Sequence, residues 1–584
     1  MNKQLEEPLT SNSPLGSIHT EDTENHIDMP SSGLSMKKSS NFLKRFSKSD
    51  ISQDTNESDN DNKNNKINKG KNEDENYRLA GRSPLKTLVY LAIGPLISQL
   101  VSACYGVVAS MWVAKAMGDL GMAAVSLFTN IDNVGRAFGF FMNCSASQKI
   151  SSLFGEGKGD EAGQVICDLM RCCVICGFIV PGLLLPPAKP IGKWFGADEI
   201  TNNMAFQYLS VLLGGSMISC FFLLFCGCLQ AEGRTTLVSI AQISSFVLNM
   251  ALFCPLFLLV FKLGTVGAGL ATVCSEAIPM LVLCFLYFRG KFGVKPKLNM
   301  LLKKFSTHTW PALSVGVSQL AANVSRSLPS ILQRKFMGLI TENPNNIEGM
   351  SFNDAMAGFN AVIRIYGITD SVRLAISMAL LPTASFANSA GMYSRFLRLI
   401  LHGCWMNLVW GASSCVVTVF GAKYVAMIIS NSENFLKAAT PMLRTSNMEA
   451  PYAWGRFICQ TILQSLSYGA LATGYSVGAT FFVNIGAYCL MYYTNKTYVS
   501  RMMWSYSVSS SVAFVAGVCC LILPLKKVYM KAKASRDVEI ENLGNGEFVD
   551  NLDEIHNEKP EKKDDCDDLS QEIEKGEEQF HDEI

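Results

Sequence analysis

The residues of this sequence that could do chemistry are a few carboxylates placed inside long apolar segments. Asp132 lies four residues before Arg136, and Asp370 lies three residues before Arg373, so each acid can meet its arginine on one face of a helix. Glu276 has no basic residue three or four positions away. Burial disfavours the charged form of a carboxyl group, so each acid is a candidate site for a proton or a small cation. We therefore take Asp132, Glu276 and Asp370 as ion-coupling candidates; for the two acid–arginine pairs the alternative is a structural ion pair near a helix end.

Uncharged polar residues and arginines in the same segments could line a substrate cavity. Asn249 and Asn484 stand 235 residues apart, as do Cys254 and Cys489, which indicates an internal repeat. Asparagines in the middle of such segments hydrogen-bond to neighbouring helices or face a cavity. For the tyrosines among the candidates, packing in the core is the alternative. The cavity candidates are Asn249, Asn484, Gln319, Tyr105, Tyr366, Arg136 and Arg373.

The segments that must position these residues are long and apolar enough to cross a bilayer. Of the 584 residues, 49% are hydrophobic and 17% are charged. Both ends are highly polar, so the middle is richer still in apolar residues and needs the bilayer as its solvent. With the repeat, the pattern predicts an all-α polytopic membrane protein with two pseudo-symmetric six-helix bundles. About twelve transmembrane helices are expected, near 87–112, 125–150, 165–186, 205–229, 236–261, 266–288, 308–336, 355–386, 398–421, 440–465, 470–493 and 503–525.

Five regions follow from this pattern. Residues 1–86 and 526–584 are polar, and we expect both to be disordered tails, the second of them acidic. Residues 87–288 and 307–525 are the two bundles, and residues 289–306 form a basic linker between them. Lys and Arg are more frequent in the turns on the side of the termini, so the positive-inside rule places both termini in the cytoplasm. We expect a multi-pass protein of the plasma membrane or an endomembrane.

The sequence offers little support for an enzyme. It contains no phosphate-binding P-loop, and Cys173-x-x-Cys176, which has the spacing of metal ligands, has no nearby His or second Cys pair. Most of its 19 cysteines lie inside apolar segments, where cysteine acts as a small packing residue. We expect no catalytic residue, no metal, no cofactor and no nucleic-acid partner.

Several motifs resemble those of multidrug and toxic compound extrusion (MATE) transporters. They are Pro95-Leu-Ile-Ser-Gln-Leu100 in the first predicted helix, Phe154-Gly-Glu-Gly-Lys-Gly-Asp-Glu-Ala162 after the second, Leu229-Gln-Ala-Glu-Gly-Arg234 after the fourth and Trp310-Pro311 at the start of the seventh. They occur in the family's order over roughly residues 85–525. The resemblance implies a monomer with a central cavity between two bundles. It also implies export of amphipathic or cationic organic compounds across a lipid bilayer in exchange for H⁺ or Na⁺, by alternating access.

The sequence departs from that family at the acids on which coupling usually depends. Ala109, Phe253, Gln319 and Ala453 stand where different branches of the family have an Asp or a Glu. These replacements leave two alternatives open beside the exporter. The first is a flippase of lipid-linked sugars, which has a related fold and favours a basic cavity. The second is a transport-inactive protein that acts as a sensor or scaffold through its tails.

Overall fold

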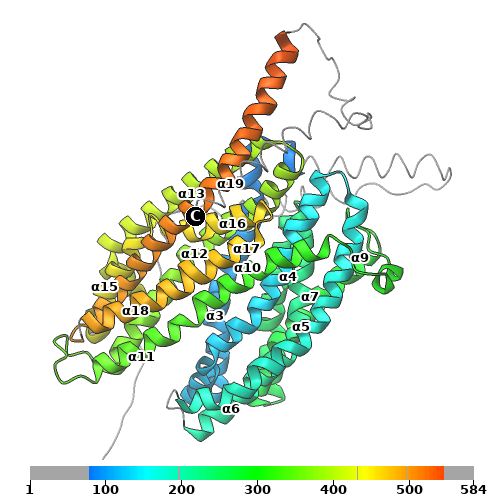
Figure 1. The fold of residues 1–584 in the computed structure, drawn as a ribbon. Coiled ribbons are helices and arrows are strands. Elements are labelled where there is room, and N and C mark those ends of the chain that lie inside the picture. The colour runs from blue at the N-terminus through cyan, green and yellow to red at the C-terminus, as the bar shows by residue number, and fades with distance from the viewer. Residues whose placement is uncertain (1–77, 195–197, 431, 495, 545–584) are drawn as a thin grey trace, which may run out of the picture. The chain divides into compact units, whose positions relative to one another are not determined.

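The computed structural model describes residues 78–194, 198–430, 432–494 and 496–544, all of which belong to one compact unit, Asn68–Ile584. The regular structure within these ranges consists of helices (Figure 1). Most of both predicted tails therefore lies outside the described residues. Only 78–86 and 526–544 of those tails can be compared with the structure.

The N-terminal half supplies one helix or helix pair for each of its six predicted spans. α4 packs against α5 and α7 within this half, and α6 packs against α9. The elements are α3 (Pro84–Leu127), α4 (Thr129–Gly155), α5 (Gly159–Trp194), the pair α6 (Glu199–Gly214) and α7 (Ser216–Ala231), α8 (Thr235–Leu248) with the π-helical turns η1 (Asn249–Phe253) and η2 (Pro255–Val260), and α9 (Gly264–Phe288).

The C-terminal half follows the same plan after a linker that contains the 3₁₀ turn η3 (Leu298–Leu302). Its fifth span carries a π-helical turn, η5, as the fifth span of the first half carries η1, which agrees with the internal repeat. The elements are α10 (Thr309–Ser327) with α11 (Pro329–Thr341), α12 (Phe352–Ser389), α13 (Tyr393–Phe420) with α14 (Ala422–Ile429), α15 (Glu433–Ser446) with η4 (Asn447–Glu449) and α16 (Gly455–Ser465), α17 (Gly469–Tyr475) with η5 (Ser476–Phe482) and α18 (Val483–Thr494), and η6 (Ser500–Met503) with α19 (Trp504–Gly544).

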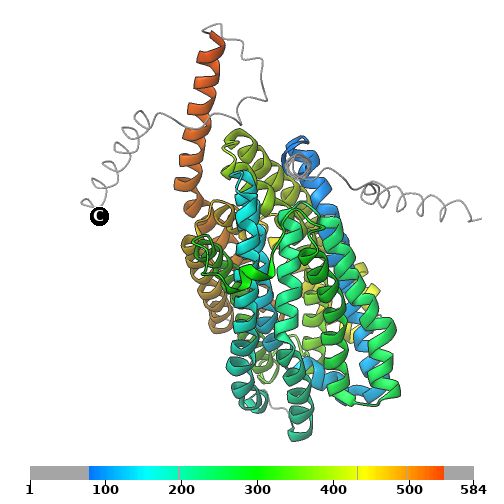
Figure 2. The same ribbon diagram turned by 90° about the vertical axis from the view of Figure 1, so that its right-hand side faces the viewer.

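The two halves meet along α3, α4, α10 and α12. α4 packs against both α10 and α12, and α12 also packs against α3. The helices of both halves run alongside one another, and the end of α19 extends beyond its neighbours (Figure 2). A polar site carried by α4 therefore lies next to the contact between the halves.

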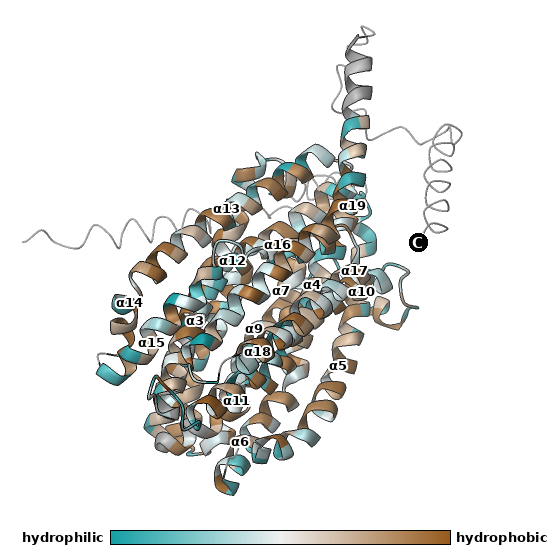
Figure 3. Ribbon diagram, turned by 60° about the vertical axis from the view of Figure 1, so that its left-hand side comes forward, coloured by the Kyte–Doolittle hydropathy of each residue, from teal (hydrophilic) through white to brown (hydrophobic). Residues whose placement is uncertain are grey.

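Hydropathy follows the position of each helix in the bundle. Among the described residues, six helices are by themselves long and apolar enough to cross a membrane, and the α6–α7 pair, bent by 47°, makes a seventh. α4 is not among them because most of its residues are buried against other helices and need not be apolar enough for lipid. Exposed apolar side chains instead occur on outward-facing helices, for example Phe178 and Leu183 of α5 and Val417 and Phe420 of α13. The ribbon of α5 is accordingly mostly brown, the colour of hydrophobic residues, in Figure 3.

The structure differs from the sequence-based boundaries at three places. α3 continues past its predicted end near 112 to Leu127, with a break at Gly118, where φ is 64°. Residues 526–544, which their polarity assigns to a tail, continue α19, because Lys, Glu and Ala favour helix. Within 78–86, Leu79 is fully buried, and its carbonyl accepts a hydrogen bond from Arg395 at 3.1 Å.

Candidate functional site

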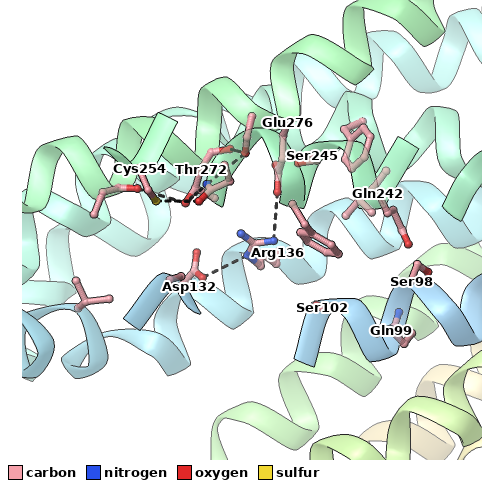
Figure 4. Close-up of a pocket in the computed structure, with 18 of the residues that line it drawn as sticks. Ser98, Gln99, Ser102, Asp132, Arg136, Gln242, Ser245, Cys254, Thr272 and Glu276 are labelled. Carbon is pink, nitrogen blue, oxygen red and sulfur yellow. Dashed lines mark hydrogen bonds and ion pairs between the residues drawn. The ribbon is translucent and has the colours of Figure 1, made fainter. Parts of the chain in front are cut away.

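Arg136 of α4 lies between two acids in the N-terminal half (Figure 4). Its Nε is 3.3 Å from Asp132 Oδ2, one turn earlier in the same helix, and its Nη1 is 3.3 Å from Glu276 Oε1 in α9. Glu276 Oε2 also accepts a hydrogen bond from the Ser219 hydroxyl of α7. The predicted pairing of Asp132 with Arg136 is present. Glu276, which has no basic neighbour on its own helix, obtains the same arginine as a partner from across the bundle.

These three charged side chains line a cavity of about 440 Å³ in the N-terminal half. The residues that line the cavity belong to α3, α4, α6, α7, α8, η1 and α9, together with Cys254. Its volume is that of a small-molecule site, and so many polar groups are costly inside a membrane unless they serve a function. The other polar residues of its lining include Ser98, Gln99, Ser102, Gln242, Ser245, Asn249, Thr272 and Ser275.

Asn249 connects the fifth span to α9 beside the charged residues. Only 1% of it is exposed, and its Nδ2 donates to Thr272 Oγ1 at 3.4 Å and to Ser275 Oγ at 3.3 Å. The Cys254 thiol donates to its Oδ1 at 3.0 Å. Asn249 is also the first residue of η1, and π-helical turns frequently occur at functional sites. Asn249 thus hydrogen-bonds across helices to α9 and also lines the cavity.

The charges of this cavity leave an excess of one negative charge when both carboxylates are ionised. Side-chain exposure is 37% for Arg136, 22% for Asp132 and 11% for Glu276, so a water-sized molecule reaches the arginine most easily. A proton or a monovalent cation at Glu276 would neutralise its charge and weaken its ion pair with Arg136. Over the described ranges, no three His, Cys, Asp or Glu side chains are grouped as metal ligands. The arrangement can thus exchange an ion pair for a bound H⁺ or Na⁺.

A second ionic cluster lies in the C-terminal half. Asp370 Oδ1 is 2.5 Å from Arg373 Nη1, as the spacing predicts, and Arg373, only 1% exposed, also donates to the Ala450 carbonyl at 3.3 Å. Glu449 of η4 is 3.5 Å from Arg456 Nη2. Asp370 is therefore in the other half of the molecule from Asp132 and Glu276, and the three ion-coupling candidates do not form one site.

Two further cavity candidates also belong to the C-terminal half. Gln319 of α10 accepts hydrogen bonds from Gln460 at 3.3 Å and from Gln464 at 3.1 Å, both on α16. The ring of Tyr366 lies 5.0 Å from that of Tyr506, and its hydroxyl is buried without a hydrogen-bond partner in the described part of the chain. Gln319 thus holds α10 and α16 together.

Comparison with known proteins decides the family. A MatE family model matches residues 95–254 and 351–488, one stretch in each half. The chain belongs to the MATE family. No curated protein matches the sequence.

Solved MATE structures have the same fold at low sequence identity. A crystal structure of MATE in complex with MaL6 is 18% identical, with a TM-score of 0.68 over 78% of this chain and 99% of that chain. An outward-facing multidrug resistance MATE family transporter of the MOP superfamily is 19% identical, with a TM-score of 0.68 over 77% and 98%. A MOP superfamily transporter from Pyrococcus furiosus Vc1, for which a reverse polarity of the binding pocket suggests a different function, is 19% identical, with a TM-score of 0.67 over 78% and 98%. The predicted all-α fold of two bundles and the resemblance to MATE transporters are confirmed.

The positions that the resemblance aligns with acids of the family differ in their surroundings. Ala109 lines the same cavity as Glu276, whereas Ala453 is fully buried and Phe253 stacks on a neighbouring aromatic ring. Asn484 is buried in α18 two residues after η5 ends, whereas Asn249 is the first residue of η1. The side chain of Tyr105 lies outside the described residues.

Two partners of the acids are absent from the sequence-based prediction. Ser219 donates to Glu276, and Ser510 of α19 donates to Glu449. Each serine is on a different helix from its acid, and serine is common throughout these apolar segments. No spacing in the sequence links such a pair, so only the packing of the helices identifies it.

Proposed function

We propose that this MATE protein is a secondary active transporter that exports amphipathic organic compounds by alternating access, in exchange for H⁺ or Na⁺ bound at Glu276 and Asp132. The observation that carries the proposal is the position of Arg136, 3.3 Å from each of these two carboxylates, in a polar cavity inside the membrane region. Buried charged groups of this kind are expensive and mark ion pathways. A site with two acids and one arginine attracts a cation.

The surroundings of Ala109 support the same assignment. An acid at that position in other MATE branches would face the cavity that Ala109 lines here. Glu276 brings a carboxylate into this cavity from α9 instead of α3. The loss of the usual acid is thus offset by an acid from another helix, which favours an ion-coupled transporter over a transport-inactive sensor.

Binding of the ion would act on the Arg136 pairs. In the unprotonated state Arg136 ties α4 to α9 through Glu276, and Ser219 holds the second oxygen of the same carboxylate. A proton on Glu276 removes the charge that attracts the arginine. Na⁺ would instead be held by oxygen atoms of Glu276, Asp132 and the hydroxyl groups of the cavity. A proton therefore releases α4 from α9, whereas Na⁺ would replace the arginine bridge between these helices with a bridge of its own.

The test is gradient-driven dye efflux from proteoliposomes with an imposed pH or Na⁺ gradient, using amphipathic dyes of either charge. We expect the wild type to respond to one gradient and Glu276→Gln to lose that response. Glu433→Gln is the control, because Glu433 pairs with Lys437 and is 82% exposed. Gradient-driven efflux that survives both Glu276→Gln and Asp132→Asn would refute the coupling site. A folded wild type that shows no gradient-driven efflux of any dye would refute the exporter and favour the flippase or sensor.

A further inference from the structure

The interior of the C-terminal half carries the opposite charge from the cavity of the N-terminal half. The ionic cluster around Asp370 and Glu449 has four buried or partly buried arginines and these two carboxylates, which leaves two positive charges in excess. The N-terminal cavity has two carboxylates and one arginine. The residues of the C-terminal cluster are Asp370, Glu449, Arg326, Arg334, Arg373 and Arg456.

Two of these arginines have no carboxylate partner among the described residues. Arg326 donates from Nη2 to Asn323 Oδ1 at 2.6 Å, and its guanidinium lies 5.1 Å from the centre of the Phe457 ring. Arg334 lies over the ring of Phe359 at 5.7 Å. Aromatic faces and a neutral amide orient a guanidinium but do not neutralise it. These two charges are therefore available to a ligand.

The arginines belong to one cluster. Arg326 of α10 lies within electrostatic range of both Asp370 and Arg456. Tyr506 of α19 lies within range of Arg456 and of Arg334. Asp370 keeps 28% of its side chain exposed, so a water-sized molecule can reach this side of the cluster. The cluster thus extends from α10 to α19, and Arg326 and Arg334 are themselves only partly buried.

Several N–H donors of the cluster also lack an acceptor. Buried polar groups are nearly always paired, so a set of unpaired donors at one place indicates a missing acceptor. Gln333, which is fully buried, uses its Oε1 to accept from the Tyr506 hydroxyl at 3.2 Å, while its Nε2 has no partner. Within the described ranges, the unpaired N–H donors of the cluster are Asn323 Nδ2, Gln333 Nε2, Arg334 Nε, Arg373 Nε and Arg456 Nε.

We propose that this cluster binds the carboxylate or phosphate group of an organic anion, with Arg326 and Arg334 as its charge partners. An oxyanion accepts several hydrogen bonds at once, and guanidinium groups bind it in a bidentate manner. A cation would meet two uncompensated positive charges. That the anion is transported rests on the proposed function, whereas its binding does not. The N-terminal half would then bind the coupling cation, and the C-terminal half would bind the anionic group of the substrate.

The test compares two dyes that share a xanthene ring and differ in charge, anionic 5-carboxyfluorescein and cationic rhodamine 6G. Their binding to the purified full-length protein in a neutral detergent is measured by fluorescence anisotropy. We expect the wild type to bind 5-carboxyfluorescein more tightly. Arg326→Gln and Arg334→Gln should each weaken that binding by about tenfold or more, since each removes a charged hydrogen-bond donor. Retained rhodamine 6G binding shows that a variant is folded.

The neighbouring residue on α11 provides a matched control. Lys335 is exposed, so Lys335→Gln removes the same charge from the same helix without touching the cluster. Arg334→Lys keeps the charge and should retain part of the affinity. Displacement of the anionic dye by short-chain phosphatidylglycerol but not by phosphatidylcholine would support the site and assign it to a lipid headgroup. Displacement by a soluble phosphate ester alone would support it and assign it to a free anion.

Three results would overturn the inference. The first is a wild type that binds the cationic dye more tightly than the anionic one, and the second is a loss of affinity for both dyes to the same extent in the arginine variants. The third is a Lys335→Gln variant that loses as much affinity for the anionic dye as the arginine variants do. The outcome is separable from that of the proposed function. Arginine-dependent anion binding without gradient-driven efflux would uphold this inference and refute the transporter. Gradient-driven efflux without arginine-dependent anion binding would support the transporter and refute this inference.

Discussion

Asp168 of α5 should hold the linker between the two halves. Its carboxylate is fully buried near the start of the helix. Oδ2 accepts hydrogen bonds from the Ser306 backbone N–H and the Thr309 hydroxyl, each at 2.7 Å, and Oδ1 accepts from Gln164 at 2.8 Å and Arg171 at 2.6 Å. The first two donors belong to the end of the linker and the first turn of α10. Removal of this carboxylate should therefore destabilise the folded protein.

The size of the effect follows from the donors that lose their acceptor. In Asp168→Ala, the Gln164 and Arg171 side chains keep an alternative acceptor, the Met300 carbonyl, at 3.1 and 3.2 Å. The Ser306 N–H and the Thr309 hydroxyl donate to no other acceptor in the described part of the chain. Each hydrogen bond to a charged acceptor contributes roughly 1.5–3 kcal/mol. Two of them give an expected loss of about 3 kcal/mol or more in the free energy of unfolding.

The measurement is unfolding of the purified protein in mixed micelles, followed by helical circular dichroism as the denaturing detergent is increased. Asp168→Asn keeps one oxygen, so its free energy of unfolding should fall by about half as much as that of Asp168→Ala. The control is Glu161→Ala, because Glu161 is 2.6 Å from His308, the residue just before α10, but is 49% exposed. An exposed pair of this kind contributes less than about 1 kcal/mol. If Asp168→Ala were no more harmful than Glu161→Ala, the reasoning from burial would be refuted.

Two further predictions concern the contact between the halves. The hydroxyl oxygens of Ser152 in α4 and Ser389 in α12 are 2.7 Å apart. The double variant Ser152→Cys, Ser389→Cys should therefore form a disulfide on mild oxidation and stop dye efflux until the disulfide is reduced. Absence of the cross-link on a gel would show that the helices do not meet there. A Cβ at Gly316 of α10 would lie 2.0 Å from Ser145 Oγ and 2.7 Å from a backbone carbonyl of α4, so Gly316→Ala should cost about 1–3 kcal/mol of stability. Gly486→Ala, with no atom within 4 Å of its Cβ, should leave the thermal midpoint unchanged or raise it, and equal midpoints for the two variants would contradict a close contact.

The sequence predicts contacts within a helix and not contacts between helices. Asp132 and Arg136 are four residues apart, so the helical period alone brings them together. Arg136 and Glu276 are 140 residues apart, and their contact depends on how α4 packs against α9. The same holds for Gln319, whose partners on α16 are 141 and 145 residues away.

The fold was predictable to the extent that lipid contact dictates composition. Helices that face lipid, such as α5, are apolar along their whole length and are easy to recognise. α4 is buried in protein, so its hydropathy falls below that of a typical span although it crosses the same bundle. Polarity misleads in the opposite direction at 526–544, because a charged helix that leaves the bundle has the composition expected of a disordered tail.

α4 is the element through which ion binding at Glu276 would affect the contact between the halves. Arg136 ties α4 to α9, and twelve residues later Gln148 Nε2 donates to Ser467 Oγ of the C-terminal half at 2.9 Å. At 1.5 Å per residue the two points are about 18 Å apart along one helix. A helix packed against both α10 and α12 shifts as a rigid body rather than bending, since packed interfaces change between discrete arrangements. Neutralising Glu276 therefore removes a restraint at one end of α4 and changes the free energy of the contact at the other, which is the physical link that ion-coupled alternating access requires.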